Sequence, residues 1–214
     1  MNQTIEHVVL FKMKPNTDQS KIDALMKGLS ELRSIDNVLH LTTGSVHKIL
    51  SSSSLKFDTF LHSRYPSKHD LDNYMACDQH MDLVNNLSDP VCEDFMIVDW
   101  VVDHDDEGLD HPPSGSAMRV TFLKLKEELL SLGESEKEIV LKMIEEQLGV
   151  CLVKQHTFGE NYAIHAKGFS IASLAVFANE DELDKAGSSE EFAERLKEKL
   201  KEFVENVFVV DYLV

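Results

Sequence analysis

The hydrophobic positions of the chain alternate between a strand pattern and a helix pattern. Residues 5–13 partly alternate and are rich in β-branched and aromatic side chains, which predicts a strand ended by Pro15. Apolar residues then recur at three- and four-residue spacing through Ile22, Leu25 and Leu29, which predicts an amphipathic helix to about residue 34. Further strands are expected at 36–48, with a bulge at Gly44, and at 55–64 and 93–102.

Two short helices are expected between the third and fourth of these strands. Ser67 and Asp70 resemble a capping box ahead of a helix through Tyr74, and Asp78 can cap a second helix over about 79–87. Asp89 and Pro90 are expected to interrupt that helix or tighten its end. The order β-α-β-β-α-β is that of a ferredoxin-like unit, whose helices cover one face of a four-stranded antiparallel sheet.

The chain then repeats this order. Residues 71–102 align without a gap with 183–214 and end in the same V-D-aromatic strand. The identities pair Leu71, Asp72, Glu93, Val98, Asp99 and Val102 with Leu183, Asp184, Glu205, Val210, Asp211 and Val214. Strands are expected at 118–126, 150–158, 168–177 and 205–214, and capping boxes at Ser135–Glu138 and Ser188–Glu191. We interpret this as a tandem duplication, with domains at 1–102 and 118–214 joined by a polar linker, 103–117.

The predicted fold class is α+β, with two ferredoxin-like halves packed sheet to sheet as an intramolecular dimeric α/β barrel. One face of each sheet is covered by its own helices, and the other is apolar and needs a cover that the second half can supply. A space between two such sheets is a natural small-molecule pocket. Several phenylalanines are expected in the core rather than around a substrate, namely Phe11, Phe57, Phe60, Phe122, Phe169 and Phe177.

Composition excludes several classes of partner. The net charge is −17, which does not suit a polyanion, and no cluster of lysine and arginine interleaves with aromatics, so nucleic-acid binding is not expected. No apolar run approaches the length of a membrane span, and the N-terminus lacks the pattern of a signal peptide. Three cysteines without paired spacing indicate a reducing compartment, so we expect a cytoplasmic protein.

Short motifs of the first copy carry a family resemblance. They are the opening His7-Val-Val-Leu-Phe-Lys, the pair Thr43-Gly44, the segment from Tyr74 to His80, and the strand ending in Val98-Asp99-Trp100. With these motifs the chain resembles the stress-responsive dimeric α/β-barrel (A/B barrel) domain family of plants, which includes the boiling-stable protein and olivetolic acid cyclase. The resemblance covers the chain in two passes, the second one weaker, and implies a stress- or defence-associated function.

The resemblance also implies candidate catalytic residues. In olivetolic acid cyclase, a tyrosine and a histidine six residues later serve the aldol cyclisation of a linear polyketide, and Tyr74 and His80 hold their places here. A histidine of the opening strand of that enzyme matches His7. The family's His-Pro-x-His motif is altered here, because Cys77-Asp78-Gln79-His80 keeps only the last histidine.

Chemistry at these positions has a physical rationale and a plainer alternative. A neutral His80 at a helix start can act as a general base, and Tyr74 can donate its hydroxyl to a developing enolate. Because six residues separate them, a break near Cys77 is needed to turn both toward the sheet. The alternative is an exposed His80 and a Tyr74 that only packs. Likewise, strand histidines without metal-ligand spacing are expected to be satisfied structurally: His7, His40, His47 and His62.

The two copies differ where the chemistry is expected. Ala186 and Phe192 stand at the places of Tyr74 and His80, so we expect at most one active pocket, in residues 1–102, with the second half as its lid and wall. Some relatives bind magnesium through carbonyls at the end of the first helix, and the resemblance places these at Leu32, Ile35 and Val38. Helix-end carbonyls can hold a cation, although water normally binds them. No other cofactor is implied.

The leading hypothesis is a stress- or defence-associated protein that binds a small apolar or aromatic molecule between its sheets. One alternative is a polyketide-cyclase-like lyase that works through Tyr74 and His80, and another is a structural interaction protein without a ligand. A closed, phenylalanine-filled interior favours the last, and an open apolar pocket ending at His80 favours the first two. The internal pairing forms a pseudo-dimer, and further oligomerisation stays open.

Overall fold

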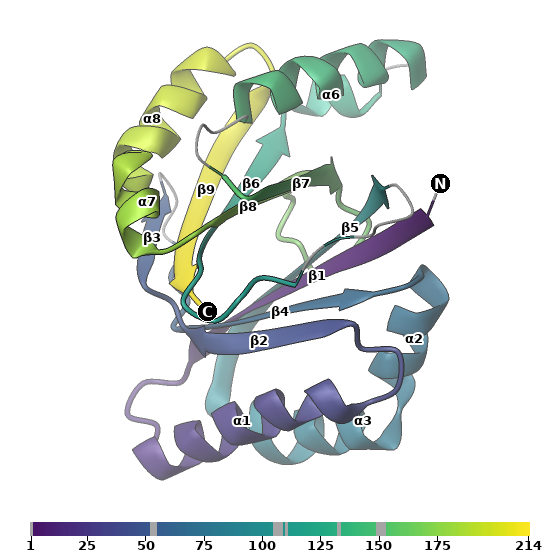
Figure 1. The fold of residues 1–214 in the computed structure, drawn as a ribbon, viewed down its shortest axis with the longest axis vertical. Coiled ribbons are helices and arrows are strands. Elements are labelled where there is room, and N and C mark those ends of the chain that lie inside the picture. Colours follow the sequence, from purple (N-terminus) through teal and green to yellow (C-terminus); the bar gives the residue numbers. More distant parts are fainter. Residues whose placement is uncertain (1, 52–54, 105–108, 110, 132–133, 149–152) are drawn as a thin grey trace.

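The fold has four layers, with helices on the outside and two antiparallel sheets face to face between them (Figure 1). It comes from a computed structural model of the 214-residue chain, which describes residues 2–51, 55–104, 109, 111–131, 134–148 and 153–214. The expected α+β class, with two ferredoxin-like halves packed sheet to sheet, is confirmed. The boundaries of the domains at residues 102 and 118 stay a prediction.

The first sheet has the strand order β2-β4-β1-β5. Its strands are β1 (Asn2–Met13), β2 (His40–Ser45), β4 (Thr59–Tyr65) and β5 (Cys92–His104), and the helices on its outer face are α1 (Gln19–Glu31), α2 (Lys68–Ala76) and α3 (Asp78–Leu83). Side chains alternate along β1, so Val9 and Phe11 pack with Leu25 of α1 while Val8 and Leu10 face the second sheet.

The second sheet has the order β3-β9-β6-β8-β7. Its strands are β3 (Lys48–Ser51), β6 (Ala117–Leu125), β7 (Gln155–Glu160), β8 (Ile171–Phe177) and β9 (Val204–Leu213). The helices of this half are α5 (Glu127–Leu130), α6 (Glu134–Leu148), α7 (Glu180–Lys185) and α8 (Ser189–Lys199). The capping box at Ser188 and Glu191 is confirmed, whereas that at Ser135 is wrong because α6 already begins at Glu134.

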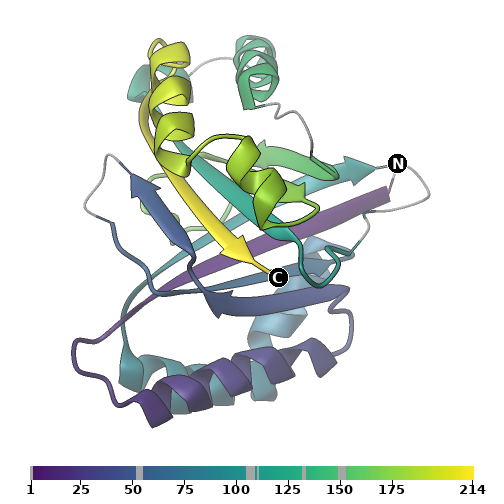
Figure 2. The ribbon, with the colours of Figure 1, turned by 60° about the vertical axis from the view of Figure 1, so that its left-hand side comes forward.

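One strand of the first half belongs to the sheet of the second. The strand expected at 36–48 ends at Ser45, and β3 crosses over to pair with β9, with Lys48 opposite Asp211 (Figure 2). The bulge expected at Gly44 is wrong, since this residue pairs regularly with Phe60. A Cβ at this position would lie 3.2 Å from the Phe60 ring, which is a tight contact.

The end of the first half's helical segment also differs from expectation. α3 continues into a π-helical turn, η2 (Val84–Ser88), and then into α4 (Asp89–Val91). Pro90 therefore does not interrupt the helix. It lies in the last short segment, after the π-helical turn and one residue before the helical run ends at Val91.

The space between the sheets is filled by side chains. All the phenylalanines expected in the core are buried, and most lie between the sheets, where Phe60 and Tyr212 have ring centroids 3.6 Å apart. Val98 and Val210, at matching places in the terminal strands, are both fully buried as the repeat predicts. Large apolar side chains of both sheets occupy this space, and the cavity of the first half lies on the other face of its sheet; binding of a small molecule between the sheets stays a prediction.

A buried ionic cluster interrupts this apolar interior. The Glu6 carboxylate accepts hydrogen bonds from His62 Nε2 at 2.6 Å, from Arg64 at 2.9 and 3.0 Å, and from Thr157 of the second half at 3.1 Å. Arg64 also donates to Gln155 Oε1 at 2.7 Å. Burial alone raises the pKa of Glu6, but the charge of Arg64 and the hydrogen bonds from His62 and Arg64 outweigh it and hold this pKa at about 2. The corresponding ladder positions of the second sheet are apolar: Met118, Leu174 and Val176.

Candidate functional site

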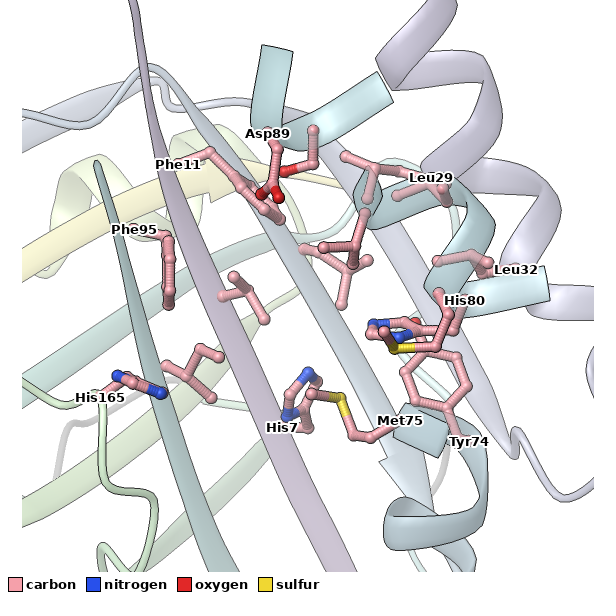
Figure 3. A pocket seen from close by; sticks show the side chains of 17 residues that line it. His7, Phe11, Leu29, Leu32, Tyr74, Met75, His80, Asp89, Phe95 and His165 are labelled. Atoms are coloured by element: carbon pink, nitrogen blue, oxygen red, sulfur yellow. The ribbon is translucent and has the colours of Figure 1, made fainter. Parts of the chain in front are cut away.

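An apolar cavity of about 260 Å³ lies between the outer face of the first sheet and the helices that cover it (Figure 3). Its walls come from β1, β4 and β5 on one side and from α1 to α3 and η2 on the other, and they are mainly aliphatic and aromatic: Val9, Phe11, Leu29, Leu32, Leu61 and Leu83. The second half contributes His165 to the rim. The cavity thus lies within the first half, on the face opposite to the one expected.

Three polar side chains of the lining, His7, Tyr74 and His80, lie toward one side of the cavity, whereas Asp89 and His165 lie away from them (Figure 3). α2 ends at Ala76, Cys77 is extended, and α3 begins at Asp78. This break, which the sequence spacing demanded, brings the rings of Tyr74 and His80 within 4.9 Å of each other. The ring of His7, on β1, lies 6.4 Å from that of Tyr74. The structure therefore brings all three predicted site residues to one cavity.

His7 is held by a carboxylate. It lies directly opposite Asp99 in the β1–β5 ladder, and its Nδ1 is 2.6 Å from Asp99 Oδ1. A carboxylate only accepts hydrogen bonds, so Nδ1 carries the proton and the lone pair of the neutral ring is on Nε2. Asp99 stood out in the sequence only as a residue shared by the two copies. The cross-strand register of β1 and β5 was the missing information, because it alone puts Asp99 beside His7.

Tyr74 is kept protonated by its surroundings. Burial raises its pKa, and a hydrogen bond with Tyr65, whose ring lies 5.0 Å away, only partly opposes this rise. The Tyr65 hydroxyl is in turn 3.0 Å from that of Ser63. The phenol is therefore suited to donate a hydrogen bond to a ligand oxygen rather than to act as a base. No sequence motif marked Tyr65, which reaches the site because it lies two residues after Ser63 on β4 and therefore on the same face of the sheet.

His80 is neutral for a different reason from the one expected. Burial lowers the pKa of its imidazole, a charge on the nearby His7 would lower it further, and a hydrogen bond to the Met75 backbone opposes the shift. Its Nδ1 is buried and has no hydrogen-bond partner among the residues that the structure describes. A neutral imidazole with an available nitrogen can accept a hydrogen bond or a proton from a ligand.

In the matching region of the second half, an ion pair takes the place of these groups among the residues that the structure describes. Arg119 takes the ladder position of His7 and donates two 2.8 Å hydrogen bonds to Asp211, the counterpart of Asp99. Its guanidinium lies 4.9 Å from the centre of the Phe192 ring, at the place of His80, and also donates to the Gly187 carbonyl. These contacts make a buried ion pair, and the expectation of at most one active pocket per chain stays a prediction.

The carbonyls proposed to bind magnesium are partly used by the backbone. Leu32 O accepts from the amide of Ile35 at 3.1 Å, and Ile35 O accepts from the amide of Val38 at 3.2 Å. A turn closed in this way does not fit the oxygen-rich octahedral site that magnesium needs. Within the described residues, histidine, cysteine and carboxylate side chains also form no group of three suited to a metal ion.

The other strand histidines lie elsewhere. His62 belongs to the ionic cluster between the sheets, and its ring centroid lies 5.3 Å from that of His40. His47 pairs with Glu180 at 3.0 Å near the surface. None of these lines the cavity, which agrees with a structural role for them.

The described part of the chain contains no helix long and apolar enough to span a membrane.

Comparison with known proteins identifies relatives of both sequence and fold. Residues 5–102 match the model of the stress responsive A/B barrel domain. A stress-response A/B barrel domain-containing protein of Arabidopsis thaliana is 39% identical over 214 residues, which cover 100% of this chain and 80% of that protein. A second Arabidopsis thaliana protein of the same description is 36% identical over 216 residues, with 100% of this chain and 98% of that protein covered.

Two solved structures resemble the whole chain at low sequence identity, so the similarity supports the fold alone. A putative monooxygenase from Fusobacterium nucleatum has a TM-score of 0.61 at 13% identity and covers 100% of this chain and 93% of its own. A putative monooxygenase from Lactobacillus acidophilus has a TM-score of 0.54 at 15% identity, with 100% and 94% covered.

Proposed function

Because the chain belongs to the stress-response A/B barrel domain family, we propose that it is a stress-associated protein whose first half binds a small, largely apolar carbonyl compound. The observation that carries this proposal is the apolar cavity with His7, Tyr74 and His80 grouped in its wall. Its volume of about 260 Å³ lies just below the ~300–1,000 Å³ typical of pockets for drug-sized ligands, so a single-ring molecule suits it.

Each part of the cavity has a distinct task in binding. The aliphatic and aromatic walls remove the body of the ligand from water, at about 25 cal/mol per Å² of apolar surface. The protonated Tyr74 donates to the carbonyl oxygen, and the neutral His80 accepts from a hydroxyl of the ligand. A site with both a donor and an acceptor selects for polar groups in defined positions, whereas the walls select only for shape.

A second candidate function is proton transfer next to a carbonyl, as a polyketide-cyclase-like lyase would require. The specific observation that favours it is the 2.6 Å contact of His7 with Asp99. The Nε2 lone pair of His7 would take a proton from the carbon beside the carbonyl, and Tyr74 would donate to the enolate oxygen that forms. The enolate carbon would then attack a second carbonyl of the same molecule, and the resulting alkoxide would take up a proton. Asp99 stabilises the intervening imidazolium.

A simple aromatic ketone tests both functions. We expect acetophenone to shift the amide NMR signals of cavity residues, and the deuterium content of its methyl group to rise in D₂O if a proton is abstracted. For a hydroxylated acetophenone, His80→Ala removes the acceptor of the ligand hydroxyl and should weaken binding about tenfold, the equivalent of about 1.4 kcal/mol. Phe192→Ala, at the matching place in the second half, should leave binding within about twofold.

Two further variants separate binding from chemistry. Tyr74→Phe and His7→Gln should slow deuterium incorporation much more than they weaken binding, since both act on the enolate and the proton rather than on the apolar body. Binding without exchange would leave a binding protein. Absence of binding by acetophenone and by hydroxylated analogues, or equal losses in His80→Ala and Phe192→Ala, would contradict a ligand site at His80.

A further inference from the structure

A loop of the second half docks on the free edge of β5, beside the His7–Asp99 pair. This loop, residues 161–165, follows β7 and makes main-chain bonds to the first half at two points. The amide of Tyr162 donates to Asp99 O at 3.0 Å, and that of Ile97 donates to His165 O at 3.1 Å. The Tyr162 ring also lies under Lys68 of α2, with the ammonium 4.1 Å from its centre. The edge of β5 is thereby closed by the other half.

Asn161 holds Asp99 more specifically than the rest of this loop. Its Oδ1 accepts from the Asp99 amide at 3.0 Å and from the Ala163 amide at 3.0 Å. Its Nδ2 donates to Ala163 O at 2.9 Å and to Phe169 O at 3.3 Å, which fixes the orientation of the amide group. Because the Tyr162 amide donates to the Asp99 carbonyl, the second half holds both peptide groups that flank the Asp99 side chain.

The other copy of this arrangement lacks the side-chain bond. There the amide of His47 donates to Asp211 O at 2.9 Å, as the Tyr162 amide does to Asp99. The residue before His47 is Val46, which has no polar side chain, where Asn161 precedes Tyr162. The Asp211 carboxylate instead accepts two hydrogen bonds from Arg119. The asparagine thus occurs beside the carboxylate that holds a histidine, and the valine beside the one that already has an arginine.

We propose that Asn161 is a positioning residue, through which the second half fixes Asp99 and thereby the tautomer of His7. An edge-strand peptide that lost this acceptor would exchange with water and move, and a displacement of about 1 Å is enough to break a contact of this kind. The inference rests on the proposed function only in that a fixed Nε2 lone pair matters for a bound carbonyl compound. The placement of Asp99 itself is independent of any ligand.

The tautomer of His7 is measurable by ¹⁵N NMR in the full-length chain, with His7→Gln to assign its signals. The wild type should show one tautomer, protonated on Nδ1. Asn161→Val, which copies the residue of the other half, should populate the second tautomer and speed exchange of the Nδ1 proton at least tenfold. Val46→Ala, at the matching place, should change neither quantity.

The outcomes decide the proposal without reference to activity. A single Nδ1-protonated tautomer with exchange within twofold of wild type in Asn161→Val would overturn it. If that variant does not fold, Asn161→Ala provides the same comparison with a smaller side chain. A tautomer change without any acetophenone binding would support the positioning role and remove the proposed function. Acetophenone binding with an unchanged tautomer would do the reverse.

Discussion

Replacing Glu6 by methionine tests whether the cluster between the sheets depends on mutual charge compensation. Methionine is the residue at the corresponding position of the second half. The variant leaves Arg64 and His62 buried, at 1% and 0% exposure, without the carboxylate that both contact. Breaking a buried ion pair from one side typically costs roughly 3–5 kcal/mol, because a desolvated charge remains. We therefore expect Glu6→Met to lose about 4 kcal/mol of unfolding free energy.

The triple variant Glu6→Met, His62→Leu and Arg64→Val gives the opposite expectation. It places the three matching residues of the second sheet at these positions and removes the charges together. Such a replacement is often neutral or stabilising. Thr157 loses its acceptor at a cost of about 1 kcal/mol, while the half-buried Gln155 can turn to water. The triple variant should thus unfold within about 2 kcal/mol of the wild type.

Urea unfolding followed by circular dichroism distinguishes the two cases. With a slope of about 2–3 kcal/mol per molar urea, Glu6→Met should lower the midpoint by roughly 1.5 M. The triple variant should recover most of this difference. A single variant as stable as the wild type, or a triple variant no more stable than the single one, would refute the argument from charge compensation.

Three other outcomes follow from the packing and the titrating groups. Val98→Asp puts a charge into the filled space between the sheets and should cost several kcal/mol, seen as a large loss of thermal midpoint; an unchanged midpoint would contradict the assignment of β5. Gly159→Ala should cost about 1–3 kcal/mol, because its Cβ would lie 2.9 Å from the Trp100 side chain and 3.0 Å from a backbone oxygen; similar midpoints for this variant and Gly44→Ala, which meets only a ring at 3.2 Å, would argue against it. Burial lowers the pKa of His62, and it lowers the pKa of His40 to about 3. Between these folded-state pKa values and about 6.5, the unfolded chain therefore binds more protons than the folded chain does. Stability should therefore fall as the pH drops from 7.5 to 5.5, and a urea midpoint that rises over this range would contradict the assignment.

Periodicity and the internal repeat were sufficient for the fold class. The terminal strands, the two helices around Cys77 and the burial of Val98 and Val210 all follow from local pattern and from the alignment of the copies. The crossing of β3 could not be seen, because residues 36–48 read as one continuous strand whichever sheet each part joins. A strand pattern reports alternation but not the identity of the neighbouring strand.

The site was predicted only in part, for a related reason. Resemblance supplied His7, Tyr74 and His80, and the spacing of the last two required the break that the structure contains. The cavity lies on the opposite face of the first sheet from the one expected. Alternation along β1 decides whether His7 or Val8 faces the helices, and both faces of that strand are apolar enough to belong to a core. Asp99 and Asn161 act through register and loop docking, which no short motif encodes.

The crossing of β3 has a consequence for how the chain folds. Its partner residues in β9 lie more than 150 positions further along the sequence, so an edge of the second sheet closes only after one of the longest loops in the molecule has formed. A chain arrested before residue 204 would carry β3 without its partner strand, and an unpaired strand is a template for association with other chains. Acquisition of native structure should accordingly be late and cooperative, and a fragment cut at residue 102 should be more prone to aggregate than the ferredoxin-like order of its strands suggests.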